Sequence, residues 1–229
     1  MIEPAPTLLD TVEAVLFDLD GTLLDTAKDL IHALNLVCDE QGQKRPDSAI
    51  AACYVSHGAV GLVKHAFPNI VADKVEPLRA RLVAIYEQNL CVHTVPYDGV
   101  SEMLAYLDQR KIPWGVVTNK KRYLAEPIME QIGMLENCRA LVGGDTAARN
   151  KPHPDPVLHA LDTMGVMADN AIYMGDAEKD ILAGKAANAT TIAASWGYIV
   201  PGQSPHDWDA DYTIDHPGDL LTLTRSRQH

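Results

Sequence analysis

Cysteine is scarce in this chain, and the few cysteines present lie far apart. Among 229 residues there are only four, and no two have the CxxC spacing of a metal or redox site. A disulfide framework or a structural zinc site needs paired or clustered cysteines. The sequence therefore predicts reduced thiols, with neither of these two stabilising devices.

Long apolar segments are also lacking. No window approaches the roughly 18 apolar residues of a membrane-spanning helix. The N-terminal stretch MIEPAPTLLDTVEAVLF carries acids and prolines instead of the basic start and apolar run of a signal peptide. We therefore expect a cytoplasmic protein that does not associate with membranes.

Positive charge is in deficit. Lysine and arginine number 19 against 31 aspartates and glutamates, which gives a formal net charge of −12. The phosphate backbone of a nucleic acid would repel such a chain, so nucleic acid is not an expected partner. A small anionic substrate would need local cations or a metal ion to bind here.

The sequence does contain a regular alternation of short apolar runs and helix-length segments. The runs that we predict to be strands are 12–17, 114–118, 140–142, 171–174, 191–194 and a short one near Tyr212. The segments with helical patterns are 100–110, 124–132, 155–164 and 177–187. Such alternation is typical of a parallel sheet with helices on both faces.

One long region interrupts this alternation. Residues 26–93 contain no convincing strand, and their helical patterns span 27–40, 48–54, 59–67 and 73–90. We therefore predict two domains, a sheet core of residues 1–25 and 94–229 and a helical domain of residues 26–93. An insertion at this point would lie over the carboxyl end of the first strand, where open α/β sheets bind ligands.

Two aspartates follow the first predicted strand, in the sequence AVLFDLDGT. Asp18 and Asp20 are two residues apart, so in extended chain both side chains point to the same side. Mutual repulsion separates the pKa values of two such close acids. One can then be an anionic nucleophile or metal ligand while the other donates a proton. Taken alone, the pair is explained equally well as a turn or helix cap.

Three further polar clusters follow other predicted strands. Thr118 and Asn119 end the run WGVVT, Lys151 lies in the loop NKPHPDP, and Asp176 lies in MGDAEKDI together with Asp180. Each cluster alone has an ordinary explanation as turn residues, a surface lysine or helix-terminal acids. Together they supply hydroxyl and amide donors, a cation and hard oxygen ligands that suit Mg²⁺ beside a phosphate.

These four motifs, in this order, resemble those of the haloacid dehalogenase-like phosphatases. The matching segments are DLDGT, VVTN, the Lys-Pro loop and GDAEKD, and the helical insert resembles the C1 cap of that family. The resemblance extends from about residue 12 to about residue 220. It implies a Rossmann-like three-layer α/β core, with a parallel sheet and an inserted α-helical cap.

Within the family, the pattern is most similar to the phosphoglycolate phosphatase type. The stretches IPWGVVTNK, EPIM and GYIVPGQ are also similar to bacterial phosphatases that act on N-acetylmuramic acid 6-phosphate. Both resemblances imply an enzyme that hydrolyses a small phosphomonoester. The resemblance leaves the oligomeric state open between a monomer and a homodimer.

The resemblance assigns catalytic roles residue by residue. Asp18 is expected to attack phosphorus and form an aspartyl-phosphate. Asp20 is expected to protonate the leaving alcohol and later to deprotonate the attacking water. Thr118 and Asn119 are expected to bind the phosphoryl oxygens, which Lys151 would neutralise.

The resemblance also assigns a metal site. Mg²⁺ is expected to bind the carboxylate of Asp18, the backbone carbonyl of Asp20 and the carboxylate of Asp176. Asp180 is expected to act on the metal indirectly, through water or by supporting a ligand.

Two further sets of residues have competing interpretations. His57, in VSHGAVG, is more simply a surface residue at a helix start, although a loop there would be able to close over the substrate. Gly58 is predicted to offer its backbone amide to an anion at that helix start. The basic run Lys120-Lys121-Arg122 is expected to be a solvated patch.

Three other functions compete with hydrolysis. A sugar phosphomutase would use the same aspartyl-phosphate but return the phosphoryl group to the sugar. A dehalogenase is disfavoured because displacement of halide needs no acid at Asp20. A protein that only binds a partner is disfavoured because both aspartates are intact.

Overall fold

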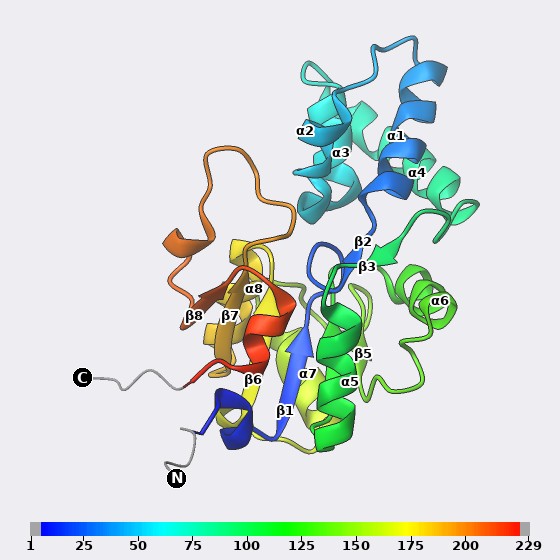
Figure 1. Cartoon of the computed structure of the whole chain (residues 1–229). Coiled ribbons are helices and arrows are strands. Elements are labelled where there is room, and N and C mark those ends of the chain that lie inside the picture. Colours follow the sequence, from blue (N-terminus) through cyan, green and yellow to red (C-terminus); the bar gives the residue numbers. More distant parts are fainter. Residues whose placement is uncertain (1–5, 225–229) are drawn as a thin grey trace.

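The computed structural model describes residues 6–224 and is built on a six-stranded parallel sheet (Figure 1). The strand order is β5-β4-β1-β6-β7-β8. The strands are β1 (Ala14–Phe17), β4 (Trp114–Val117), β5 (Leu141–Val142), β6 (Ala171–Gly175), β7 (Thr190–Ala194) and β8 (Tyr212–Ile214). The predicted strands are confirmed to within two residues. The first begins later than predicted because Val12 ends the 3-10 helix η1 (Leu8–Thr11).

Helices cover both faces of this sheet, as predicted. On β1, Val15 and Phe17 pack with the buried side chains of α5 and α6, whereas Leu16 packs on the opposite face with those of α7 and α8. Successive side chains of a strand point to opposite faces, so a strand buried on both sides is continuously apolar. The covering helices are α5 (Val100–Arg110), α6 (Arg122–Ile132), α7 (Asp155–Met164) and α8 (Glu178–Ala186). The three-layer α/β fold is confirmed.

A bundle of helices lies beyond the carboxyl ends of the strands (Figure 1). Its members are α1 (Ala27–Glu40), α2 (Ser48–Ala52), the 3-10 helix η2 (Val55–His57), α3 (Gly58–Ala66) and α4 (Ala72–Glu87). Both α1 and α3 pack against α4. The predicted helices are confirmed, except that the second is shorter and is followed by η2, and that the last ends at Glu87 and not at residue 90. The exact domain division at residues 25/26 and 93/94 stays a prediction.

Two short strands mark where the chain leaves the sheet and returns to it. These are β2 (Leu24–Asp25) and β3 (Val95–Pro96), which pair in antiparallel fashion. The remaining short elements are the 3-10 helices η3 (Ala168–Asn170), η4 (Pro205–Asp207) and η5 (Pro217–Leu221). Within residues 6–224, no helix is both long enough and apolar enough to cross a lipid bilayer.

A buried carboxylate joins the segment in which the chain leaves the sheet to the segment in which it returns. Asp29 of α1 is 2% exposed and accepts hydrogen bonds from the backbone N–H groups of His93 and Thr94 and from the Thr94 hydroxyl. The Asp29→Ala substitution would leave these buried donors without their acceptor. We expect it to lower the free energy of unfolding by about 3 kcal/mol. Urea denaturation measures this change.

The matched control for this prediction is Asp39→Ala, at the other end of the same helix. Asp39 forms an exposed ion pair with Arg45, and such pairs contribute little to stability. Equal losses of stability in the two variants would contradict the role assigned to Asp29.

Candidate active site

The polar clusters that follow β1, β4 and β6 meet at one edge of the sheet. Asp18 follows β1, and its backbone N–H donates to the carbonyl of Met174 in β6. Asp18, Thr118 and Asp176 are all buried. They come together because β1 lies between β4 and β6 and parallel strands end at the same edge. The structure thus brings together residues that are up to 158 positions apart in the sequence.

Lys151 lies at the centre of this group with no side-chain exposure. Its Nζ is 2.8 Å from Oδ1 of Asp18 and 2.7 Å from Oδ1 of Asp180. It also donates to the carbonyl of Val117 and contacts the hydroxyl of Tyr173. Burial alone would lower the pKa of Lys151, but the two carboxylates outweigh it and raise the pKa. The lysine is therefore a fixed positive charge.

The loop that carries Lys151 is held by Asn119. The amide nitrogen of Asn119 donates to the carbonyl of Lys151, and its amide oxygen accepts from the N–H of Lys151, both at 3.1 Å. The Asn119 side chain therefore positions the lysine. Asn119 also lines the cavity described below, and its predicted contact with phosphoryl oxygens stays a prediction.

Three carboxylates form a buried acidic cluster beside Lys151. One oxygen from each of Asp18, Asp176 and Asp180 lies within 4.8 Å of the others. Burial and then the neighbouring acids raise the pKa of Asp176 to about 7. The pKa of Asp18 is also raised, mainly by burial. Three acids against one lysine leave a negative site of hard oxygen donors, which fits a divalent cation such as Mg²⁺.

Within this cluster, Asp180 already has protein partners on both oxygens. Its Oδ1 pairs with Lys151 and accepts from the hydroxyl of Tyr173, and its Oδ2 accepts from the N–H of Ala177. Asp176 likewise accepts hydrogen bonds on both oxygens, from Thr22, Ser56 and Tyr198, so the indirect role of Asp180 stays a prediction.

The raised pKa of Asp176 predicts that this carboxyl contributes less to the stability of the metal-free protein as the pH rises. This carboxyl titrates near 3.8 when unfolded and near 7 when folded. Its contribution is therefore complete below pH 3.8 and is lost as the pH rises toward 7. In chelator, we expect the stability of Asp176→Asn relative to the unaltered protein to rise as the pH increases from 3.8 to about 7, and to stay level above that. Added Mg²⁺ should offset this gain by stabilising the unaltered protein. If the thermal stabilities of the two proteins in chelator changed in parallel with pH, this prediction would be contradicted.

The glycine of DLDGT is required by the close approach of Asp176. Gly21 has a φ of +92°, and a Cβ there would lie 2.1 Å from Oδ2 of Asp176. A residue with a side chain would be strained in this conformation and would displace the carboxylate. The turn after Asp20 therefore accommodates only glycine.

Asp20 lies beside the acidic cluster and has partners of its own. Its Oδ1 accepts from the hydroxyl of Thr26 and pairs with Nζ of Lys120, both at 2.6 Å. The prediction that the whole basic run is solvated is wrong for Lys120, whose side chain is only 7% exposed. It is enclosed by Asp20 and by the ring of Tyr86, whereas Arg122 pairs with Glu126 at the surface.

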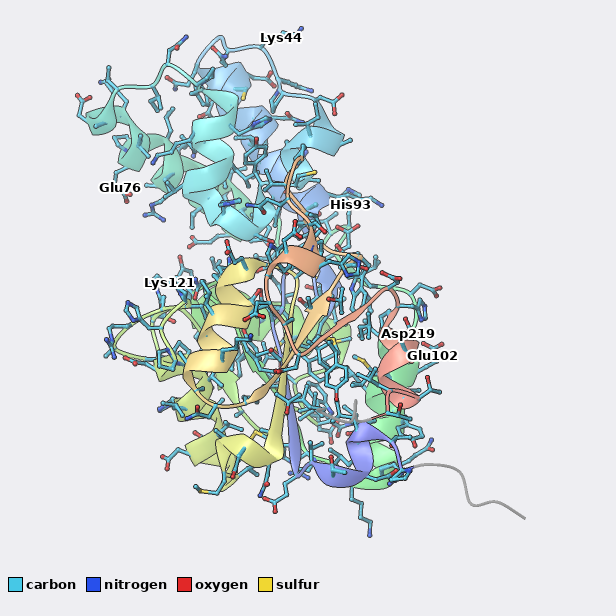
Figure 2. The ribbon with its side chains drawn as sticks, turned by 90° about the vertical axis from the view of Figure 1, so that its left-hand side faces the viewer. Lys44, Glu76, His93, Glu102, Lys121 and Asp219 are labelled. Atoms are coloured by element: carbon cyan, nitrogen blue, oxygen red, sulfur yellow. The ribbon has the colours of Figure 1, made fainter. Side chains whose placement is uncertain are left out.

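A cavity of about 390 Å³ separates the sheet edge from the helical bundle. Among the residues that line its sheet side are Asp18, Asp20, Thr118 and Asn119. On the bundle side the lining includes His57, Gly58, Arg79 and Tyr86, together with the apolar side chains of Val55, Val60 and Val83. Figure 2 shows the two facing parts, with Glu76 labelled on the bundle and Lys121 on the sheet side.

The predicted bundle residues, His57 and Gly58, both line this cavity. His57 is exposed and directly precedes α3, which begins at Gly58. Partial shielding of the imidazole from water, and then the charge of Lys179, lower the pKa of His57. The interpretation of His57 as a helix-start residue therefore agrees with its position. Binding of substrate by His57 or Gly58 stays a prediction.

Two residues that join the bundle to the site were missed by the sequence analysis. The hydroxyl of Ser56 donates to Oδ2 of Asp176 at 2.9 Å. Nζ of Lys179, on α8, donates to the carbonyl of Ser56. Lys179 lies within the motif GDAEKD, to which only the two aspartates contributed predicted roles, and nothing in the sequence around Ser56 indicates its contact with Asp176.

Fold and site together define an α/β enzyme whose centre combines paired aspartates with a buried lysine. A family model described as haloacid dehalogenase-like hydrolase matches residues 15–194. The chain belongs to this family.

Curated relatives carry phosphatase names. A phosphoglycolate phosphatase of Xanthomonas campestris pv. campestris is 42% identical over 207 residues, which cover 90% of this chain and 94% of that protein. An N-acetylmuramic acid 6-phosphate phosphatase of Pseudomonas aeruginosa is 40% identical over 213 residues, covering 93% and 94%. The predicted enzyme class, a phosphoric monoester hydrolase, is confirmed.

Solved structures agree on the fold. A protein described as a predicted phosphoglycolate phosphatase from Haemophilus somnus has a TM-score of 0.83 at 23% identity, covering 92% of this chain and 97% of its own. A haloacid dehalogenase-like hydrolase from Streptococcus pneumoniae has a TM-score of 0.79 at 21% identity, covering 93% and 98%. At such low sequence identities the structural similarity shows the fold alone.

Proposed function

We propose that this protein is a Mg²⁺-dependent phosphatase that hydrolyses a small phosphomonoester through an aspartyl-phosphate on Asp18. The observation that carries the proposal is the position of Lys151, buried between Asp18 and Asp180 and beside Asp176. Like charges about 4 Å apart repel by about 4 kcal/mol at an effective dielectric constant of about 20. A nucleophilic carboxylate can approach an anionic phosphate only where positive charge, such as that of Lys151, offsets this repulsion.

The reaction uses residues of the chain in two steps. An oxygen of Asp18 bonds to phosphorus while the bond to the leaving oxygen breaks, and Asp20 gives that oxygen a proton. Water then attacks phosphorus, gives a proton to Asp20, and the bond to Asp18 breaks. Thr118 and Asn119 orient the phosphoryl group, and Lys151 offsets its charge.

The donor set assigns a place to the metal ion. Asp18, the backbone carbonyl of Asp20 and Asp176 would hold Mg²⁺, supported by Asp180. When bound, the ion supplies positive charge beside the phosphoryl oxygens.

The helical domain, residues 26–93, acts as a cap on the core formed by residues 1–25 and 94–229. We propose that it opens to admit substrate and closes to exclude water before Asp18 attacks. The contact of Ser56 with Asp176 supports this role, because it joins the cap to the reaction centre. We also propose that the enzyme works in the cytoplasm as a monomer or homodimer.

The leading substrate is 2-phosphoglycolate, which is supported by the names of several relatives. A second candidate, N-acetylmuramic acid 6-phosphate, is favoured by the size of the cavity. Its volume of about 390 Å³ falls in the range of sites that bury drug-sized ligands. A two-carbon phosphate ester would fill only a small part of it.

The test is a panel of phosphomonoesters assayed for released inorganic phosphate. The panel contains 2-phosphoglycolate, N-acetylmuramic acid 6-phosphate and hexose phosphates, each with Mg²⁺ and with chelator. We expect release from one of the first two, loss of activity in chelator and recovery with Mg²⁺. Isomerised hexose phosphate without free phosphate would instead indicate a phosphomutase.

A further inference from the structure

The burial of Lys120 is not explained by the roles assigned so far. Lys120 follows Asn119 on the loop between β4 and α6, and its Nζ lies 2.6 Å from Oδ1 of Asp20. On the bundle side, the same Nζ lies 5.0 Å from the centre of the Tyr86 ring. The ammonium group of Lys120 is thus held between Asp20 and Tyr86.

The contacts of the Asp20 carboxylate involve one of its two oxygens. Thr26 and Lys120 both bind Oδ1. Across residues 6–224, no side chain or backbone group makes a hydrogen bond to Oδ2 of Asp20. Since Asp20 lines the cavity, one oxygen is fixed by the protein and the other is left for a ligand.

The other half of this arrangement comes from the helical bundle. Tyr86 lies on α4 and is 1% exposed. A cation over an aromatic face is attracted by the ring, most strongly where water is excluded. Removal of α4 from this position would expose the ammonium group and weaken its hold on Asp20.

Resting on the proposed function, we propose that Lys120 is a positioning residue that aims Asp20 at the leaving oxygen, and that Tyr86 completes this arrangement from the bundle. The hydrogen bonds that Lys120 and Thr26 donate to Oδ1 limit rotation of the Asp20 carboxyl group, whether or not Oδ2 carries a proton. Correct alignment is then linked to the presence of the bundle over the sheet. A misplacement of about 1 Å at a reacting group can cost on the order of 10²-fold in rate.

The experiment measures kcat/KM for aryl and alkyl phosphate monoesters whose organic groups carry no charge and whose leaving groups range from acidic phenols to simple alcohols. Protonation of the leaving group matters for alcohols and hardly for acidic phenols. We expect Lys120→Met to lower kcat/KM by about 10- to 100-fold for alkyl esters and to change it little for p-nitrophenyl phosphate. The dependence on leaving-group basicity should therefore steepen, as it should in Asp20→Asn.

The double variant separates positioning from substrate binding. If Lys120 acts through Asp20, Lys120→Met should add almost nothing to the loss in Asp20→Asn. Losses that multiply, with an unchanged leaving-group dependence, would mean that Lys120 binds substrate directly and would overturn the proposal. Tyr86→Leu should shift the dependence in the same direction as Lys120→Met, and an unchanged dependence would overturn the role of the bundle.

Two controls complete the design. Lys121→Met removes the neighbouring lysine, whose Nζ donates to the carbonyl of Gly144, and should leave the leaving-group dependence unchanged. Lys120→Gln, whose folding is checked by thermal unfolding, takes the place of Lys120→Met if that variant fails to fold. If the unaltered protein hydrolysed no ester, both this inference and the proposed function would fail. If the unaltered protein is active and Lys120→Met lowers kcat/KM equally for all esters, only this inference is contradicted.

Discussion

Replacement of Asp18 by asparagine is expected to abolish hydrolysis of every phosphomonoester that the protein accepts. An amide oxygen carries no negative charge, so it is a very poor nucleophile toward phosphorus. We expect kcat to fall by at least about 10⁴-fold, because loss of a covalent nucleophile removes the reaction path itself. Phosphate release under saturating substrate and Mg²⁺ measures the effect.

The Asp18→Asn variant should still fold. Asparagine has the shape of aspartate, and Lys151 keeps Asp180 as a partner at 2.7 Å. We therefore expect a thermal unfolding temperature close to that of the unaltered protein in chelator. The nucleophile would have to be sought elsewhere if a freshly prepared, deamidation-free sample kept more than a small share of the activity.

Replacement of Lys151 by methionine is expected to have the second largest effect. Loss of a preorganised charge at a site of developing negative charge typically costs about 10²- to 10³-fold in kcat. It would also leave Asp18 and Asp180 buried without their cation. Breaking a buried ion pair in this way costs about 3–5 kcal/mol of stability. We therefore expect activity and stability to fall together in Lys151→Met, as measured by phosphate release and urea denaturation.

The matched control is Lys185→Met. Lys185 on α8 forms an ion pair with the exposed Asp209, so its loss should change neither property much. A stable, active Lys151→Met variant would contradict the central position that we assign to Lys151.

Much of the fold was predictable because it depends on local pattern. The runs around Val15, Val116 and Ile172 are short and apolar, as expected of strands buried on both faces. The long strand-free region could be seen because helical periodicity extends over many residues. Strand ends were less certain, since Val12 has an apolar side chain but belongs to the end of η1.

The convergence of the polar clusters was also predictable, for a topological reason. Parallel strands end at one edge, so polar residues that follow different strands converge. Asp18, Lys151 and Asp176 meet as this rule requires. The individual partners of each side chain were not predictable. Asn119 holds the backbone of Lys151, and nothing in the segment VVTN indicates that contact.

The sequence by itself determined the alternation of strands and helices, the order of the four motifs and the edge at which they act, because these follow from periodicity and chain direction. Only the tertiary structure decided which charges are buried. Lys120 and Arg122 lie in one basic run, yet Lys120 is enclosed by Asp20 and Tyr86 while Arg122 is at the surface. Ser56 reaches Asp176 across 120 positions of sequence. Such contacts depend on how the helical bundle packs over the sheet, and a linear pattern carries no record of that packing.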